Sequence, residues 1–312
     1  MPPELDITRH NPLIDPTVHV WGWEIPVYLF LGGWVAGSIV LSGYFLRRGR
    51  RPGARSVGFV LPWLGLVLLS LGMGALFLDL EHKLYVWRMY LTFQPASPMS
   101  WGGWILILVY PFLALAALAS IPDDLLAGWP AIARFAARVR EPSALRWLGS
   151  ASMAVGIALG IYTGILLSTL GARPLWATAA LGPLFLVSGL STGAAFAHLI
   201  ARDPDEQATL LKADNAFLGV ELALIGLMLI GLLTASAVHA DAARLLLGGP
   251  YTAVFWVLVV GLGILLPLTL QALMASHRIP HTVVAPLLVI GGGLALRFVI
   301  VAAGQYSHWT SP

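Results

Sequence analysis

The sequence contains no cysteine and few charged residues, and each shortage excludes a class of function. Without cysteine, the chain forms no disulfide and supplies no thiolate ligand to an iron–sulfur cluster. Charged residues make up 11% of the chain and hydrophobic residues 58%, whereas soluble domains carry about 25% charged residues. The composition therefore excludes a sizeable soluble domain and indicates an integral membrane protein.

Long apolar runs fill most of the 312 residues. A membrane-spanning helix needs about 20 consecutive apolar residues. Eight runs meet this length, at residues 22–46, 57–80, 100–121, 147–170, 174–201, 213–237, 251–274 and 282–306. The start of the chain carries acids and prolines where a signal peptide has basic and apolar regions. We therefore expect an all-α integral membrane protein with eight transmembrane helices.

Histidine is scarce inside the apolar runs, which argues against haem. Only His198, near the end of its run, lies inside one, and a cytochrome b anchor needs axial ligands that face each other from within its helices. The sequence thus predicts no haem and no metal in this chain, and nothing in it predicts binding of nucleic acid. For electron transfer, a diffusible cofactor must carry the electrons, and a partner protein must accept or donate them.

Lysine and arginine are distributed unevenly between the two sides of the membrane. The side of the N-terminus receives five of the 18 and the opposite side twelve, with Arg297 inside the last run. Cytoplasmic loops carry the excess of basic residues. The sequence therefore predicts a multi-pass protein of a bacterial inner membrane, with both termini in the periplasm.

Two connecting segments are distinctive. The stretch 77–104 places charged residues, aromatic residues and two prolines at the predicted outer boundary, between the second and third runs. The longest cytoplasmic connection, 123–146, has an apolar stripe of Ile132, Phe135, Ala136 and Val139 beside several arginines. This pattern predicts a short amphipathic helix that lies on anionic membrane lipid.

Polar side chains near the outer ends of the runs form a first candidate site. Asp79 ends the second run, and Arg173 precedes the fifth. Tyr28 and Tyr162 lie toward the outer ends of the first and fourth runs. Because these residues map to one side, we expect a proton-exchanging pocket near the outer face. A simpler interpretation is that Asp79 pairs with Lys83, four residues later, and that the tyrosines belong to the interfacial belt.

A second polar group lies deeper in the membrane. A charge at the bilayer centre costs about 2.5–3.5 kcal/mol, so such residues are functional candidates. Glu221 lies near the middle of the sixth run, with Asp214 and Asn215 about two turns before it. Together with His198, they predict a proton path from the cytoplasm toward Arg297. Alternatively, Glu221 and Arg297 form a structural pair and His198 caps its helix.

The sequence resembles the NrfD-like membrane subunits of respiratory oxidoreductases. The resemblance extends from about residue 20 to residue 306, and several motifs carry it in the family's order. They are WGWEIPVY at 21–28, LDL at 78–80, PASPMSWG at 95–102, YTG at 162–164, RPLW at 173–176 and the last run from Gly293 to Gln305. The P-x-S-P-M-S-W-G and RPLW elements are the specific ones.

The resemblance implies two four-helix bundles, at 22–170 and 171–306, between a periplasmic N-terminal segment at 1–21 and a periplasmic tail at 307–312. It also implies a quinone or quinol, either menaquinone or ubiquinone, near the periplasmic face. The implied partners are a periplasmic four-cluster iron–sulfur subunit and a catalytic subunit of molybdopterin, hydrogenase or cytochrome type. The aromatic loop 85–104 then forms the roof of the site and part of the docking surface for the iron–sulfur subunit.

The resemblance also suggests roles for individual residues. By position, Tyr28 and Tyr162 match residues that line the family's quinone pocket, and Asp79 matches its acidic residue at the end of the second helix. We therefore expect the two tyrosines to hydrogen-bond the quinone head group and Asp79 to exchange the proton. His82 would relay the proton to the aqueous edge, and Arg173 would shape the mouth of the pocket.

Three classes of function stay open from the sequence. The first is the quinone-binding membrane subunit of a multi-subunit respiratory oxidoreductase, coupled to proton translocation if the polar path conducts. The second is a haem-free transporter or proton channel, and the third is a structural anchor without a quinone site. Co-purification with an iron–sulfur protein distinguishes the first class from the second, and a bound quinone excludes the third.

Overall fold

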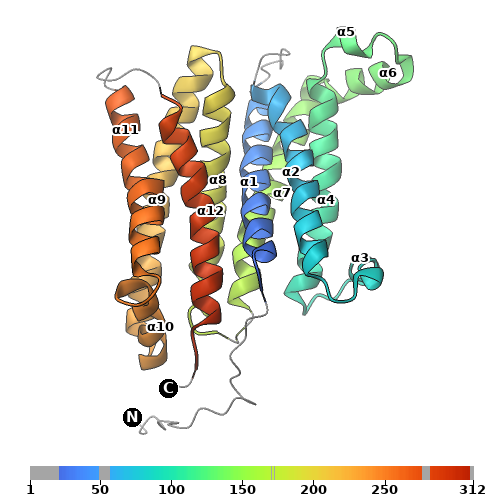
Figure 1. Ribbon diagram of the computed structural model, residues 1–312. Coiled ribbons are helices and arrows are strands. Elements are labelled where there is room, and N and C mark those ends of the chain that lie inside the picture. The colour runs from blue at the N-terminus through green and yellow to red at the C-terminus, as the bar shows by residue number, and fades with distance from the viewer. Residues whose placement is uncertain (1–20, 49–56, 170, 172, 276–281, 310–312) are drawn as a thin grey trace.

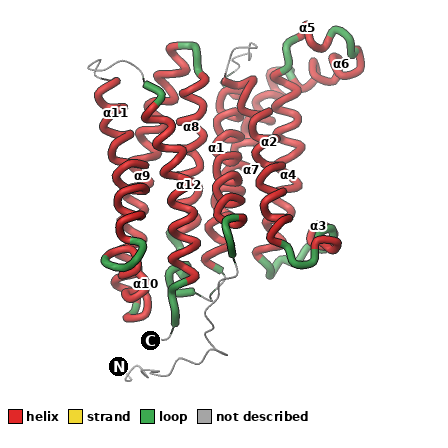
Figure 2. Tube along the Cα trace, in the orientation of Figure 1, coloured by secondary structure: helices red, strands yellow, loops and turns green. Residues whose placement is uncertain are grey.

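The computed structural model describes residues 21–48, 57–169, 171, 173–275 and 282–309, and in this part of the chain all regular structure is helical (Figure 1, Figure 2). No strand occurs within these ranges. Eight of their helices are long and apolar enough to cross a membrane. The expected fold class is therefore confirmed. The predicted N-terminal segment at 1–21 lies outside the described residues except for Trp21.

The long helices follow the predicted order. They are α1 (Glu24–Arg47), α2 (Val57–Asp79), α4 (Pro98–Ser120), α7 (Pro142–Ser168), α8 (Leu181–Ile200), α9 (Pro204–Ala235), the π-helix η2 (Val254–Leu265) continued by α11 (Leu266–Ala275), and α12 (Val284–Gln305). The shorter helices are η1 (Lys83–Tyr85), α3 (Arg88–Leu91), α5 (Asp123–Leu126), α6 (Pro130–Val139) and α10 (Ala237–Leu247). Proline opens α4, α7 and α9, because the first helical position needs no backbone N–H.

Successive long helices run in opposite directions, so α1 begins and α12 ends on the same face (Figure 1). We call this the terminal face, defined by Glu24 and Gln305; it also carries α3 and α10. The other face, which we call the opposite face, carries α5 and α6. The connecting segments that the sequence assigned to the same side of the membrane therefore lie on the same face of the structure. That the terminal face is periplasmic stays a prediction.

The first helix, α1, is central to the packing. It contacts α2, α4 and α7 on one side and α8 and α12 on the other. At Gly37, α1 approaches α8 so closely that a methyl group would overlap the carbonyl oxygen of Gly189. Such contacts between small residues let helices pack closely where lipid supplies no hydrophobic drive for association. The division of the chain into two four-helix bundles stays a prediction.

The fifth transmembrane helix is shorter than predicted. The sequence predicted a span at 174–201, but α8 begins only at Leu181. Residues 173–180 instead form a turn-rich segment, in which the Trp176 N–H donates to the Arg173 carbonyl at 3.2 Å. Much of the segment is nevertheless buried. Hydropathy extended the span because it reports burial, not backbone conformation.

Two other helices begin earlier than predicted because their first turns are polar. The fourth span was expected from 147, yet α7 begins at Pro142. The sixth was expected from 213, yet α9 begins at Pro204 and has 32 residues. Asp203 caps α9, since its carboxylate accepts a hydrogen bond from the Asp205 N–H at 3.0 Å. Hydropathy detects the apolar part of a helix and not its capped polar end.

The helix α10 on the terminal face was not predicted. It begins directly after Ser236, whose hydroxyl accepts a hydrogen bond from the His239 N–H at 3.4 Å. The next span, η2, packs on α12 where Gly263 meets Gly292, with no room for a side chain at either glycine. The cap of α10 is local but polar, and the Gly263–Gly292 contact joins segments distant in sequence, so hydropathy reports neither feature.

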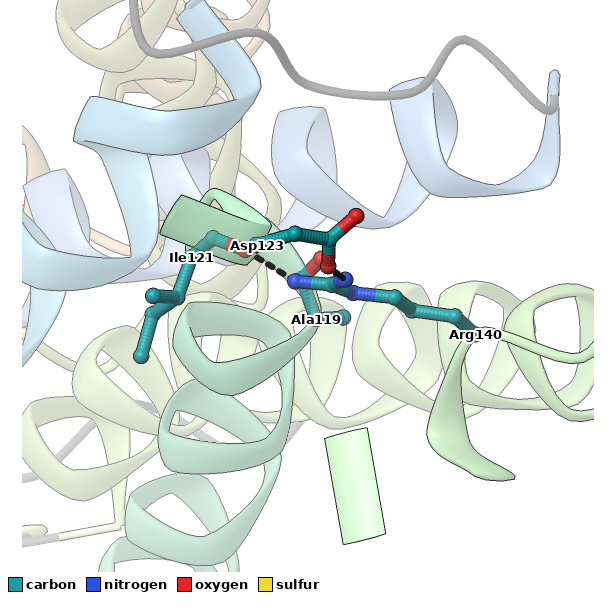
Figure 3. A network of polar contacts seen from close by, with 4 residues as sticks. All are labelled: Ala119, Ile121, Asp123 and Arg140. Carbon is teal, nitrogen blue, oxygen red and sulfur yellow. Dashed lines mark hydrogen bonds and ion pairs between the residues drawn. The ribbon is translucent and has the colours of Figure 1, made fainter. Parts of the chain in front are cut away.

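The predicted amphipathic segment folds as α5 and α6 across the opposite face (Figure 1). Arg140, just after α6, fastens this segment to the C-terminal end of α4. Its Nε donates to the Ala119 carbonyl at 3.1 Å, and its terminal nitrogens bind the Ile121 carbonyl and the Asp123 carboxylate (Figure 3). Carbonyls at a helix C-terminus lack partners within the helix and attract cations. Contact of α6 with anionic lipid stays a prediction.

We expect Arg140→Gln to loosen α5 and α6 while the eight spans stay folded. The Asp123 side chain is 85% exposed, so its ion pair contributes little. The bonds to the two carbonyls contribute about 1–2 kcal/mol. Amide hydrogen exchange in residues 123–139 should therefore accelerate about tenfold. The matched variant Arg138→Gln, at an exposed position, should leave exchange unchanged, and equal exchange in both variants would contradict the assigned role.

Candidate functional site

Tyr28 lies one turn into α1, at the terminal face, and is 4% exposed. It belongs to an apolar cluster that includes Ile25, Leu29 and Trp176. Its phenol lies close enough to Tyr162 for the two groups to interact electrostatically. The structure therefore brings together the two tyrosines that the sequence predicted as hydrogen-bond donors.

Tyr162, near the end of α7, is 5% exposed and packs against the first turns of α4. A methyl group at Gly102 would overlap Cζ and Oη of the Tyr162 ring. Gly102 is the last residue of the PASPMSWG motif. The glycine of this motif thus makes room for the phenol of Tyr162.

Two further tyrosines, which the sequence did not single out, extend this group. Tyr90 of α3 lies near both Tyr28 and Tyr162, and Tyr110 of α4 lies near Tyr90. Burial, and to a smaller extent Tyr110, raises the pKa of Tyr90 above its ordinary value, so its phenol stays protonated at neutral pH. The only signal in the sequence was the aromatic density of 77–104. We call these four residues the tyrosine cluster.

The hydroxyl groups of Tyr28 and Tyr162 are available as hydrogen-bond donors. Among the residues that the structure describes, the Tyr28 and Tyr162 hydroxyls form no hydrogen bond. Neither hydroxyl is among the fully enclosed polar atoms without a partner, so each can reach water or the oxygen of a ligand. Two protonated phenols in apolar surroundings can donate hydrogen bonds to a flat, mainly apolar molecule that carries carbonyl oxygens.

Asp79 is the last residue of α2 and is partly exposed on the same face. Its carboxylate interacts electrostatically with Glu24 at the start of α1. Among the described residues no ion pair joins it to Lys83, because α2 ends at Asp79 and Lys83 belongs to the separate helix η1. The simpler interpretation of an Asp79–Lys83 pair is therefore wrong. His82, between the two helices, is exposed, as a relay to water requires, and its role stays a prediction.

A second polar group lies inside the membrane region around Arg297 of α12, which is 1% exposed. Its guanidinium donates to the Phe185 carbonyl at 2.9 Å, to the Gly293 carbonyl at 3.2 Å and to the Ser188 hydroxyl. Glu221 interacts with Ser188 and lies in the field of Arg297. No direct ion pair joins the two charges in the described chain. Ser188 is therefore the link between them, instead of the direct pair considered from the sequence.

Asp214 of α9 lies toward the opposite face and is fully buried. Its Oδ1 accepts a hydrogen bond from the Ser191 hydroxyl at 2.7 Å, and its Oδ2 accepts one from Gln271 Nε2 at 2.6 Å. Asp214 also interacts electrostatically with Glu221. Gln271 of α11 was missed, because a single glutamine in an apolar run gives no periodic signal.

The remaining residues of the predicted proton path lie at the same end. His198 lies in the last turn of α8 and is buried. Asn215 is partly buried, and its Oδ1 has no hydrogen-bond partner among the described residues. The structure therefore joins Asp214, Glu221 and Arg297 into one polar group. Conduction of protons through it stays a prediction.

Comparison with known proteins decides the family. The chain matches the family described as "Polysulphide reductase, NrfD" over residues 9–307. The chain belongs to the NrfD family. It is 29% identical to a polysulfide reductase chain from Wolinella succinogenes, across 92% of this chain and 94% of that protein. It is 30% identical to protein NrfD of Escherichia coli, across 92% of this chain and 95% of that protein.

A third relative matches a shorter region. A tetrathionate reductase subunit from Salmonella typhimurium is 27% identical over 183 residues, which are 58% of this chain and 48% of that protein. Together with the eight apolar helices, the family match makes this chain a multi-pass integral membrane protein. The resemblance to NrfD-like membrane subunits is confirmed.

The PASPMSWG motif of this NrfD-family chain is largely a scaffold. Ser100 Oγ accepts a hydrogen bond from the Gln94 N–H at 3.0 Å and donates to the Thr92 carbonyl at 3.3 Å. Trp101 Nε1 donates to the Pro95 carbonyl at 2.7 Å. These bonds fix the turn into α4, at whose start Gly102 receives Tyr162. The motif thus positions the tyrosine cluster without a side chain of its own in it.

The RPLW motif ties the ends of the described chain together. Arg173 is buried and donates to the Ser307 carbonyl at 3.0 Å. Trp176 stacks on Trp21 with ring centroids 5.2 Å apart, and its Nε1 donates to the Ile300 carbonyl at 2.9 Å. These contacts make Arg173 a residue that holds the end of α12. Its predicted role at the mouth of a quinone pocket stays a prediction.

Proposed function

We propose that this chain is the membrane subunit of a multi-subunit respiratory oxidoreductase and that it binds a quinone or quinol at the tyrosine cluster. The observation that carries the proposal is the pair of buried tyrosines, Tyr28 and Tyr162, whose hydroxyls form no hydrogen bond within the described chain. The relatives named as parts of a polysulfide reductase and of a tetrathionate reductase support membership of such a complex.

The residues present fit a quinone head group. Tyr28 and Tyr162 would each donate a hydrogen bond to a carbonyl oxygen, and Tyr90, whose pKa burial raises further, adds a third donor. The side chains that pack around Tyr28 are apolar, as a ring and an isoprenoid tail require. When bound, a quinol supplies two electrons and two protons on oxidation, and a quinone takes them up.

Asp79 is the residue we propose to hold the transferred proton. Its carboxyl lies at the end of α2, partly exposed on the terminal face, so it reaches water. No ion pair within the described chain fixes its charge, so the carboxyl can change protonation state without breaking one. His82, exposed three residues later, would pass the proton to the aqueous edge.

The partners we propose are a periplasmic four-cluster iron–sulfur subunit and a catalytic subunit of molybdopterin, hydrogenase or cytochrome type. The terminal face presents an exposed apolar surface around α3, where Leu84 is 86% exposed and Leu91 73%. Exposed apolar patches of this kind mark interaction sites. A polypeptide that docks here lies beside Tyr90, the member of the tyrosine cluster on α3, and so close to the site of electron exchange.

Purification from native membranes in mild detergent tests this proposal. We expect an iron–sulfur protein to co-purify, detected by electron paramagnetic resonance after chemical reduction, and the absorption spectrum to lack a haem Soret band. Substitution of Leu84 and Leu91 by serine should weaken the association while the eight spans stay folded. A chain that purifies alone in every detergent tried and transports solute after reconstitution would contradict the proposal.

The proton path gives a separate prediction. We expect Glu221→Gln to lower quinone-dependent proton uptake from the opposite face by about tenfold or more in reconstituted vesicles, because the substitution removes the central titratable group. Electron transfer to the partner should persist. The exposed residue Glu141 provides the control, Glu141→Gln, with unchanged uptake. Normal proton uptake in Glu221→Gln would rule out a proton path through Glu221.

A further inference from the structure

Four side chains near the opposite face offer more hydrogen-bond acceptors than donors. Ser191 and Gln271 each donate one hydrogen bond to the Asp214 carboxylate, at 2.7 and 2.6 Å. Each carboxylate oxygen keeps a further lone pair. Gln271 Oε1 and Asn215 Oδ1 are buried and receive no hydrogen bond within the described chain. The excess consists of oxygen acceptors, so a cation or a donor must satisfy it.

The two unpartnered amide oxygens lie at the same level of the membrane region. Leu211 of α9 and Met274 of α11 belong to one packed cluster. The two helices run in opposite directions and contact each other. Asn215 follows Leu211 by about one turn, and Gln271 precedes Met274 by about one turn. Both steps lead toward the terminal face, so Asn215 and Gln271 lie at about the level of Asp214, which Gln271 contacts.

The charge of the surrounding group favours one monovalent cation. Glu221 and Arg297 carry opposite charges and interact through Ser188, so they offset each other. This leaves the single negative charge of Asp214, which is fully buried. A buried charge is paired, neutralised or bound to a metal ion. A divalent cation would leave an uncompensated positive charge in the apolar interior.

We propose that Asp214, Asn215, Gln271 and Ser191 form a binding site for Na+. They supply carboxylate, amide and hydroxyl oxygens, the ligand types that hard cations prefer. The Ser191 Oγ that donates to Asp214 Oδ1 at 2.7 Å keeps lone pairs of its own, which a cation would share. The proposal revises the expectation of no metal in this chain. It goes beyond the proposed function, because it requires neither quinone nor a partner subunit.

Thermal unfolding of the full-length chain in detergent tests the site. We expect the melting temperature to rise with NaCl, and not with KCl or choline chloride at equal ionic strength, because only a bound ion stabilises the folded state. Asp214→Asn should abolish the response to Na+. Gln271→Leu and Ser191→Ala should each weaken the apparent Kd for Na+ about tenfold. Equilibrium dialysis with radioactive sodium gives the stoichiometry directly.

The control Asp124→Asn makes the same substitution at an exposed aspartate on α5 and should keep the full Na+ response. Stabilisation by Na+ no greater than by K+ or choline would overturn the proposal, as would an intact response in Asp214→Asn. Quinone binding is measured in the same samples. If the wild-type chain binds quinone but is not stabilised by Na+, only the cation site is rejected. If it is stabilised by Na+ but does not bind quinone, only the quinone site is rejected.

Discussion

Replacing Asp79 by asparagine is expected to lower quinol oxidation by the assembled complex about a hundredfold, the size of effect that general acid–base groups contribute. Asparagine keeps the shape of the side chain and its place at the end of α2, but it cannot hold a proton. The loss should therefore appear in kcat, with little change in KM. The measurement is steady-state oxidation of a soluble quinol analogue, with the iron–sulfur partner present and its content quantified.

The matched control for Asp79→Asn is Glu81→Gln. Glu81 is exposed on the same face, two residues later in the chain, so the variant removes one charge near the site without touching the proposed proton acceptor. It should turn over like the wild type. Equal rates for Asp79→Asn and the wild type, with the complex assembled, would rule out Asp79 as the proton-exchanging residue.

Introducing a single methyl group at Gly102 is expected to disable the site by displacing Tyr162. The Cβ of Gly102→Ala would overlap Cζ and Oη of the phenol, so the ring must leave its position. Overpacking of this kind costs about 1–3 kcal/mol of stability. Loss of the hydrogen bond from Tyr162 should weaken quinone binding about tenfold or more. Quinone titration and thermal unfolding of the same sample measure both effects.

The control for Gly102→Ala is Gly74→Ala. Gly74 lies in α2, and a methyl group there meets no atom within 4 Å. Alanine also favours a helix over glycine, so this variant should be as stable as the wild type or slightly more stable. If Gly102→Ala bound quinone as the wild type does, Tyr162 would not be needed at its position.

The sequence predicted the number and order of the long helices well, because the length of an apolar run determines whether it can cross a membrane. The eight runs correspond to eight helices of the described chain that are long and apolar enough to cross a membrane, because a bilayer allows few other solutions for a segment of that length. The errors occurred at ends. The segment 173–180 is largely buried without being helical, whereas the first turns of α7 and α9 are helical although they precede the apolar runs. Hydropathy reports neither case.

The candidate site was predictable only in part. Tyr28 and Tyr162 were found from position and motif, and the structure brings them together. Tyr90 and Gln271 were not found, because each becomes informative only through a neighbour from a distant part of the chain. The role of Gly102 was not found either, because the partner of this glycine, Tyr162, follows only from tertiary contacts.

The most direct test of the account is a quinone titration of the purified chain, followed by quenching of its tryptophan fluorescence. A quinone site at the tyrosine cluster predicts saturable binding to the wild type and at least about a hundredfold weaker binding to the double variant Tyr28→Phe/Tyr162→Phe. Binding to Tyr251→Phe should be unchanged, because this variant alters another tyrosine of the terminal face, one whose ring packs on Tyr306. Equal affinity of the wild type and the double variant would contradict a quinone site at the tyrosine cluster.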